Sequence, residues 1–118
     1  MHTLIFLNGD PPSEEVISYF LKESNYIIAA DGGANYLKSA DLCPDVIIGD
    51  LDSVKKETLS FFRERVKIIK IRDQNTTDFE KCLLYCVREK RKKVIVFGIS
   101  GDRIDHTLNN FSILKRYY

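Results

Sequence analysis

Hydrophobic residues in this chain gather in five short runs that alternate with longer segments of mixed polarity. Most of the runs are rich in β-branched residues and apolar at nearly every position, which is typical of strands buried on both faces of a sheet. They cover residues 3–7, 26–30, 46–48, 66–71 and 94–97. The segments between them have helical spacing and predict helices over 13–23, 34–40, 54–63 and 78–90, with a last helix from residue 105 onward. This alternation predicts an α/β fold: an open, mostly parallel, Rossmann-like doubly wound sheet with helices on both faces.

Length and composition are those of one folded domain over residues 1–118. The chain has 118 residues, of which 44% are hydrophobic and 30% charged, as in ordinary globular proteins. Eighteen basic and 17 acidic residues leave a net charge of +1, so we expect no nucleic-acid partner. The sequence shows no apolar run long enough for a secretion signal or a membrane span, so we expect a cytoplasmic protein with no membrane partner.

The fourth predicted helix carries two cysteines and ends in a basic cluster. Cys82 and Cys86 would share one face of the helix, and the three cysteines of the chain show no C-x-x-C spacing, so we expect buried free thiols. Thr77 and Glu80 form a capping-box signature at the start of the helix. The basic cluster, residues 88–93, is predicted to be a solvated helix end whose cations complement the helix dipole.

Each predicted strand is followed by a turn of small residues with at least one aspartate. In a parallel sheet these turns open on one edge, where ligands of such sheets bind. Crowded carboxylates repel one another, so a stable cluster calls for a cation, and oxygen ligands suit Mg²⁺ shared with a phosphate substrate. Asp50 and Asp52 are the first predicted ligands, because residues two apart in extended backbone point to the same side. Asp78, at the start of a helix, is the third.

Simpler roles compete with this interpretation, since aspartate and glycine are common in turns and helix caps. We expect such roles for Asp10, Asp41 and Asp73. Asp52 or Ser53 could likewise cap the helix that follows. For the whole Gly-Asp-Leu-Asp-Ser segment at 49–53, the functional interpretation is the stronger one.

Phosphate binding is the natural companion of a magnesium site. The pairs at 32–33 and 100–101 are small-residue junctions where backbone N–H groups can approach an anion, although neither is a P-loop or a G-x-G-x-x-G motif. Lys81 and Arg103 could each neutralise a phosphate or form a surface ion pair. His106 could orient a ligand or cap a helix.

Four ordered motifs resemble those of the thiamine pyrophosphokinase family over essentially the whole chain. They are DGGAN at 31–35, PDVIIGDLDS at 44–53, QNTTDFEKCL at 74–83 and GDRIDHTLNN at 101–110. The resemblance implies transfer of diphosphate from ATP to the primary hydroxyl of thiamine, giving thiamine diphosphate and AMP. It also implies Mg²⁺ as cofactor and ATP as co-substrate.

The resemblance further implies roles for individual residues. Asp50, Asp52 and Asp78 match the acidic metal and phosphate site and, with Asp105, are the expected catalytic residues. Asp78 or Asp105 could accept the proton of the attacking hydroxyl. The residues expected to contact the nucleotide or its phosphates are Asp31, Gly32, Asn35, Asn75, Thr77, Lys81, Ser100, Arg103 and His106.

Enzymes of this family are similar to the chain only in their first half. A β-rich domain that helps to bind thiamine follows in them, and a homodimer builds the site between subunits. We therefore expect this chain to be the catalytic α/β half. Two other functions stay open: a related diphosphokinase for another alcohol such as a hydroxymethylpterin, and a non-catalytic module that binds ATP and Mg²⁺.

Overall fold

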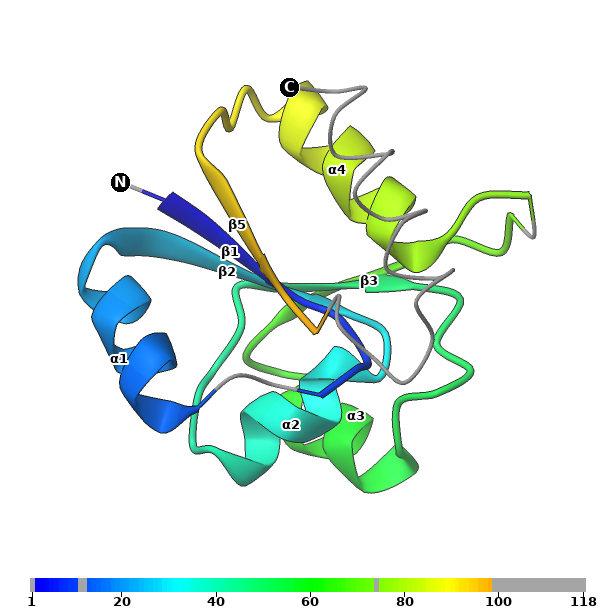
Figure 1. The fold of residues 1–118 in the computed structure, drawn as a ribbon. Helices are drawn as coiled ribbons and strands as arrows, with labels where there is room; N and C mark the ends of the chain where they lie inside the picture. The colour runs from blue at the N-terminus through cyan, green and yellow to red at the C-terminus, as the bar shows by residue number, and fades with distance from the viewer. Residues whose placement is uncertain (1, 11–12, 74, 99–118) are drawn as a thin grey trace.

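The protein, described here by a computed structural model for residues 2–10, 13–73 and 75–98, is built on a parallel sheet (Figure 1). The five strands lie in the order β4-β3-β2-β1-β5, and every neighbouring pair is parallel. The strands are β1 (His2–Phe6), β2 (Ser24–Ala30), β3 (Val46–Gly49), β4 (Lys67–Lys70) and β5 (Val94–Phe97). The helices are α1 (Glu14–Lys22), α2 (Gly33–Ser39), α3 (Lys56–Phe62) and α4 (Asp78–Arg88).

The predicted fold class is confirmed. The chain lays β1 to β4 side by side in one direction and then returns across the sheet to place β5 beside β1. Each predicted strand and helix within the described ranges is present, with ends that differ by at most a few residues. The helix expected from residue 105 onward lies outside the described residues.

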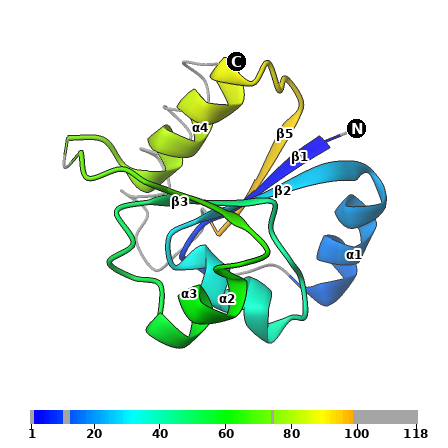
Figure 2. The same cartoon turned by 180° about the vertical axis from the view of Figure 1, so that it is seen from behind.

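Helices cover both faces of the sheet, as expected for an open α/β fold (Figures 1 and 2). Helices α1, α2 and α3 cover one face, where Leu4, Phe6 and Ile47 are fully or almost fully buried. On the other face α4 packs over Ile5 and Ile48. Neighbouring residues of one strand therefore belong to opposite layers, and this is why the strand segments are apolar at nearly every position.

Hydrogen bonds at the helix starts agree with the sequence. The Oγ of Ser13 accepts the N–H of Val16 at 3.4 Å at the start of α1. The Oγ1 of Thr77 accepts the N–H of Glu80 at 3.0 Å at the start of α4. Among the helices in the described ranges, none has both the length and the apolar character needed to cross a membrane.

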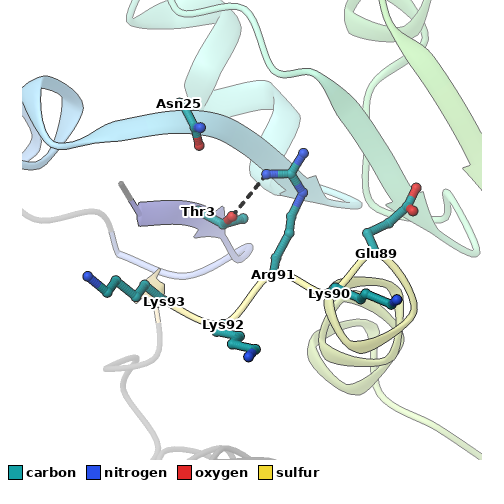
Figure 3. A pocket seen from close by; sticks show the side chains of 7 residues that line it. All are labelled: Thr3, Asn25, Glu89, Lys90, Arg91, Lys92 and Lys93. Carbon is teal, nitrogen blue, oxygen red and sulfur yellow. Dashed lines mark hydrogen bonds between the residues drawn. The ribbon is translucent and has the colours of Figure 1, made fainter.

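The basic cluster at the end of α4 lines a hollow of about 490 Å³ at the amino edge of the sheet. Arg91 lies over the ring of Tyr26, 3.5 Å from its centroid, and donates to Thr3 Oγ1 at 3.5 Å. The side chains of Lys90, Lys92 and Lys93 point in different directions and do not converge on one place (Figure 3). All three lysines are exposed, which fits the solvated helix end predicted from the sequence.

Candidate active site

Three carboxylates meet at the carboxyl edge of the sheet. Asp31 follows β2, Asp50 follows β3 and Asp78 is the first residue of α4. Because β2 and β3 are paired up to Ala30 and Ile48, the residues after them lie side by side. One oxygen from each of the three carboxylates lies within 4.8 Å of the others. The structure thus brings together residues from three separate motifs.

Asp31 holds the loop that follows β3. Its Oδ2 accepts the N–H of Asp52 at 3.1 Å, and its Oδ1 accepts those of Ser53 at 3.1 Å and Val54 at 2.9 Å. The side chain is only 1% exposed. The residue has a positive φ of 47°, which aspartate tolerates better than most side chains. An aspartate expected to contact the nucleotide is therefore also a structural anchor of the loop.

Asn35 holds the same loop from α2. Its Oδ1 accepts the N–H of Lys55 at 2.9 Å, and its Nδ2 donates to the carbonyl of Ser53 at 3.1 Å. The two glycines between Asp31 and Asn35 allow α2 to begin close to β1, since a Cβ on Gly33 would overlap the carbonyl oxygen of Phe6. The DGGAN turn is thus a clamp on residues 52–55.

Electrostatics couple two of the carboxylates. Burial, and then a hydrogen bond with the Asp50 carboxyl, raise the pKa of Asp31 to about 6. The pKa of Asp50 is lowered by that bond with Asp31 and by the N–H of Asp52, which donates to Asp50 Oδ1 at 3.1 Å. A cation reaches the group as well, because Lys81, only 4% exposed, has its Nζ 3.4 Å from Asp78 Oδ1.

Gly49 makes the close approach of the carboxylates possible. It has a φ of 147°, and a Cβ there would lie 3.0 Å from Asp78 Oδ1 and 3.1 Å from the Cβ of Asp31. In the sequence, Gly49 belongs to the segment 49–53 predicted to be functional, but no role of its own is predicted for it. Its position directly before Asp50 at a strand end is the signal that points to such a role.

The prediction that extended backbone turns Asp50 and Asp52 to the same side is wrong. Leu51 between them has a φ of 68°, in the left-handed region, so the backbone there is not extended. The Asp52 side chain is exposed. The third member of the carboxylate cluster, beside Asp50 and Asp78, is Asp31. Asp31 could have been recognised as a member, because it follows directly the buried strand that neighbours β3. The role of Asp52 as a metal ligand stays a prediction.

The cluster of carboxylates from Asp31, Asp50 and Asp78 fits a hard divalent cation. Mg²⁺ binds oxygen at ~2.1 Å in octahedral geometry, so oxygens on opposite sides of the ion are roughly 4 Å apart. Oxygens on adjacent positions of the octahedron are roughly 3 Å apart, so the three oxygens, which lie within 4.8 Å of one another, would move closer together to bind one ion. Asp31 already accepts three N–H groups, which leaves Asp50 and Asp78, both partly exposed, as the freer ligands.

The other predicted site residues occupy different places. Thr77 caps α4 beside Asp78. Asn75 is exposed, and its N–H donates to Asp73 Oδ1 at 2.9 Å in a turn of the kind expected for Asp73. Gly32 is buried near the side chain of Asn8. Ser100, Arg103, Asp105 and His106 lie outside the described residues.

Comparisons with known proteins agree with the four motifs. Residues 17–118 match the model of a family described as thiamin pyrophosphokinase, catalytic domain. Thiamine pyrophosphokinase 1 of Arabidopsis thaliana is 33% identical, over 98% of this chain and 51% of its own length. Thiamin pyrophosphokinase 1 of Caenorhabditis elegans is 29% identical, over 96% of this chain and 49% of its own.

Solved structures show the same fold. Thiamin pyrophosphokinase from Candida albicans aligns with a TM-score of 0.82 at 21% identity, covering 98% of this chain and 53% of its own. A thiamin pyrophosphokinase family protein from Enterococcus faecalis aligns with a TM-score of 0.76 at 25% identity, covering 96% and 54%. The chain spans about half the length of the curated relatives it matches. This chain therefore belongs to the thiamin pyrophosphokinase family, in the part that forms the catalytic domain.

Proposed function

We propose that this chain is the ATP- and Mg²⁺-binding half of an enzyme that transfers diphosphate from ATP to thiamine. The observation that carries the proposal is the group of Asp31, Asp50 and Asp78 beside buried Lys81, at the edge of the sheet where ligands of this fold bind. The matched relatives are named as thiamine pyrophosphokinases. Because the chain spans about half their length, the proposal includes the expected β-rich second domain and the homodimer.

Asp50 and Asp78 are the proposed metal ligands, with Asp52 as a third. When bound, Mg²⁺ would supply positive charge that offsets the charge of the phosphates and of the leaving group. Lys81 places a second cation 3.4 Å from Asp78 Oδ1. Its burial keeps that charge close to the phosphates and away from bulk water, where it would be screened.

The reaction is proposed to be one in-line displacement. The oxygen of the primary hydroxyl of thiamine forms a bond to the β-phosphorus, and the bond from that phosphorus to the oxygen bridging the α-phosphate breaks. The bridging oxygen keeps the electron pair and leaves as part of AMP. Asp78, or Asp105 from the last motif, accepts the hydroxyl proton. The work of the site is then to orient the two substrates and to balance charge.

The direct test is incubation of the full-length enzyme, with this chain as its first half, with ATP, Mg²⁺ and thiamine, followed by chromatography of the products. We expect AMP and thiamine diphosphate in equal amounts. AMP formation with a hydroxymethylpterin and none with thiamine would contradict the proposed acceptor. Tight binding of an ATP analogue without AMP release for any alcohol would favour a binding module.

Substitution of the ligands tests the metal assignment. We expect Asp50→Asn and Asp52→Asn to lower Mg²⁺-dependent AMP release by roughly 100-fold, the size of effect seen when a group that stabilises transition-state charge is lost. Asp41→Asn is the matched control, because Asp41 lies after α2 with a φ of 59°, which asparagine also adopts. Activity within a few-fold of the parent in both variants would show that the metal assignment is wrong.

A further inference from the structure

We propose that Asn35 is a positioning residue for the metal site, which acts through the loop at residues 52–55 and does not contact the nucleotide. The proposal rests on the proposed function in that it assumes a metal held by Asp50. It assigns to the asparagine of the DGGAN turn a different role from the nucleotide contact that the family resemblance implies.

Both ends of the Asn35 amide are already engaged with the loop. The Oδ1 accepts the N–H of Lys55 at 2.9 Å, and the Nδ2 donates to the carbonyl of Ser53 at 3.1 Å. The loop presents one donor and one acceptor, and a side-chain amide offers the complementary pair, an acceptor oxygen and a donor nitrogen. An aspartate would lose the donor, and an alanine would lose both groups.

The start of α3 explains why this support is needed. Lys55 is the N-cap residue of α3, and its side chain makes no capping hydrogen bond. Helix starts leave backbone N–H groups without partners inside the helix. Asn35 binds the N–H of Lys55 from outside α3 and so fixes the point where the loop joins that helix.

The loop in turn places the carboxylate of Asp50. The N–H of Asp52 donates to Asp50 Oδ1 and to Asp31 Oδ2, both at 3.1 Å. Asp31 holds the loop at residues 52–54, and Asn35 holds it at 53 and 55. Without Asn35 the loop keeps its buried anchor but loses its second one. Asp52 is then free to move, and its N–H no longer holds the carboxylate of Asp50 in one orientation.

The test measures metal binding and loop protection without any substrate. Binding of Mn²⁺ is measured by electron paramagnetic resonance, and exchange of the Lys55 amide hydrogen by mass spectrometry. For Asn35→Ala we expect Mn²⁺ affinity to fall about tenfold, as for residues that orient metal ligands, and exchange at Lys55 to become faster. Asn35→Asp keeps the acceptor, so we expect it to protect the Lys55 amide.

Two further variants sharpen the test. Ser39→Ala is the matched control on the same helix, since Ser39 Oγ donates only to the carbonyl of Tyr36 among the described contacts. It should leave Mn²⁺ affinity unchanged. Lys55→Pro removes the N–H that Asn35 accepts, and the φ of −73° at this position suits proline. If Asn35→Ala fails to fold, the same loss of affinity in Lys55→Pro supports the proposal.

Two results would overturn it. One is unchanged Mn²⁺ affinity, with unchanged exchange at Lys55, in a folded Asn35→Ala variant. The other is weaker binding of metal-free ATP in Asn35→Ala but not in Lys55→Pro, which would indicate a direct nucleotide contact. Neither readout involves thiamine, so failure of this proposal and failure of the proposed diphosphate transfer can be told apart.

Discussion

At the scale of single residues, the cluster of three carboxylates depends on the absence of a Cβ at Gly49. Gly49 stands between Asp31 and Asp78, and its φ of 147° is one that L side chains rarely adopt. Any Cβ at this position meets Asp78 Oδ1 at 3.0 Å and the Cβ of Asp31 at 3.1 Å. Gly49 thus allows both the backbone turn after β3 and the short distances between the carboxylates.

Replacing Gly49 by alanine should therefore affect stability and metal binding together. We expect the free energy of unfolding to fall by about 1–3 kcal/mol, the range for backbone held in a disfavoured conformation. We also expect weaker Mn²⁺ binding, because Asp78 is pushed away from Asp31. Urea unfolding and Mn²⁺ titration measure the two effects. Ser60→Ala, on the exposed side of α3, is the control, and an equal loss in both variants would contradict the prediction.

How far the site could be predicted from the sequence is also decided at single residues. Asp50 and Asp78 could be recognised, because a strand end and a helix start are visible in the pattern of polar positions. The turn at Leu51 could not, since a positive φ at a leucine leaves no sign in hydrophobic periodicity. The clamp by Asp31 and Asn35 could not be predicted either, because it depends on contacts between residues about 20 positions apart.

At the scale of elements, α4 joins the site to the core. Its first residue, Asp78, belongs to the carboxylate cluster, and Lys81 three positions later contacts Asp78. Cys82, Leu83 and Cys86 on the same helix are completely buried against the sheet. Any change at the start of α4 is therefore expected to move Asp78, Lys81 and the packing residues together.

Substitutions at the N-cap of α4 distinguish a structural role of Thr77 from a nucleotide-binding role. Thr77→Ala removes the hydroxyl that accepts the N–H of Glu80, and we expect it to lower the free energy of unfolding by about 1 kcal/mol. Thr77→Ser keeps the hydroxyl and should retain most of the stability. Urea unfolding checks both variants. Full stability of Thr77→Ala together with weaker ATP binding would indicate that the hydroxyl serves the nucleotide instead.

The buried face of α4 also predicts how the thiols behave. Burial raises the pKa of Cys86 to about 11 and raises that of Cys82 as well, whereas Cys43 is exposed. Since the thiolate is the reactive form, we expect one fast-reacting thiol per chain with a disulfide reagent at pH 8 and three in denaturant. The loss of Cys43 in a Cys43→Ser variant should abolish the fast phase, and a fast phase that survives would contradict the packing of α4.

The same thiols give the direction of a pH effect. A folded-state pKa above the ordinary cysteine value of 9.0 means that ionisation of the thiol favours the unfolded chain. The contribution of Cys86 to stability is therefore complete below pH 9 and is lost as the pH rises toward 11. Comparing the urea midpoints of the parent and Cys86→Ala across this range isolates the effect, because the variant lacks the titrating group.

At the scale of the whole molecule, the fold could be predicted further than the site. Strands buried on both faces are apolar at nearly every position, and the helices between them are amphipathic, so the element order follows from composition along the chain. The order β4-β3-β2-β1-β5 is set by the connections between the strands and not by their composition. It places the ends of β2 and β3 side by side. The site is assembled by this arrangement from segments that are far apart in sequence.

Because the carboxylates follow β2 and β3 and begin α4, a metal ion bound to them should stabilise the whole domain. A ligand that binds only the folded state at ten times its Kd adds about 1.4 kcal/mol to the free energy of unfolding. For a domain of this size we expect Tm to rise by roughly 5 °C when Mg²⁺ is added, and to return to its starting value with a chelator. Asp50→Asn should lose the shift, and sodium chloride at equal ionic strength should not reproduce it. An equal rise of Tm with Mg²⁺ in the parent and in Asp50→Asn would mean that the ion binds elsewhere on the protein.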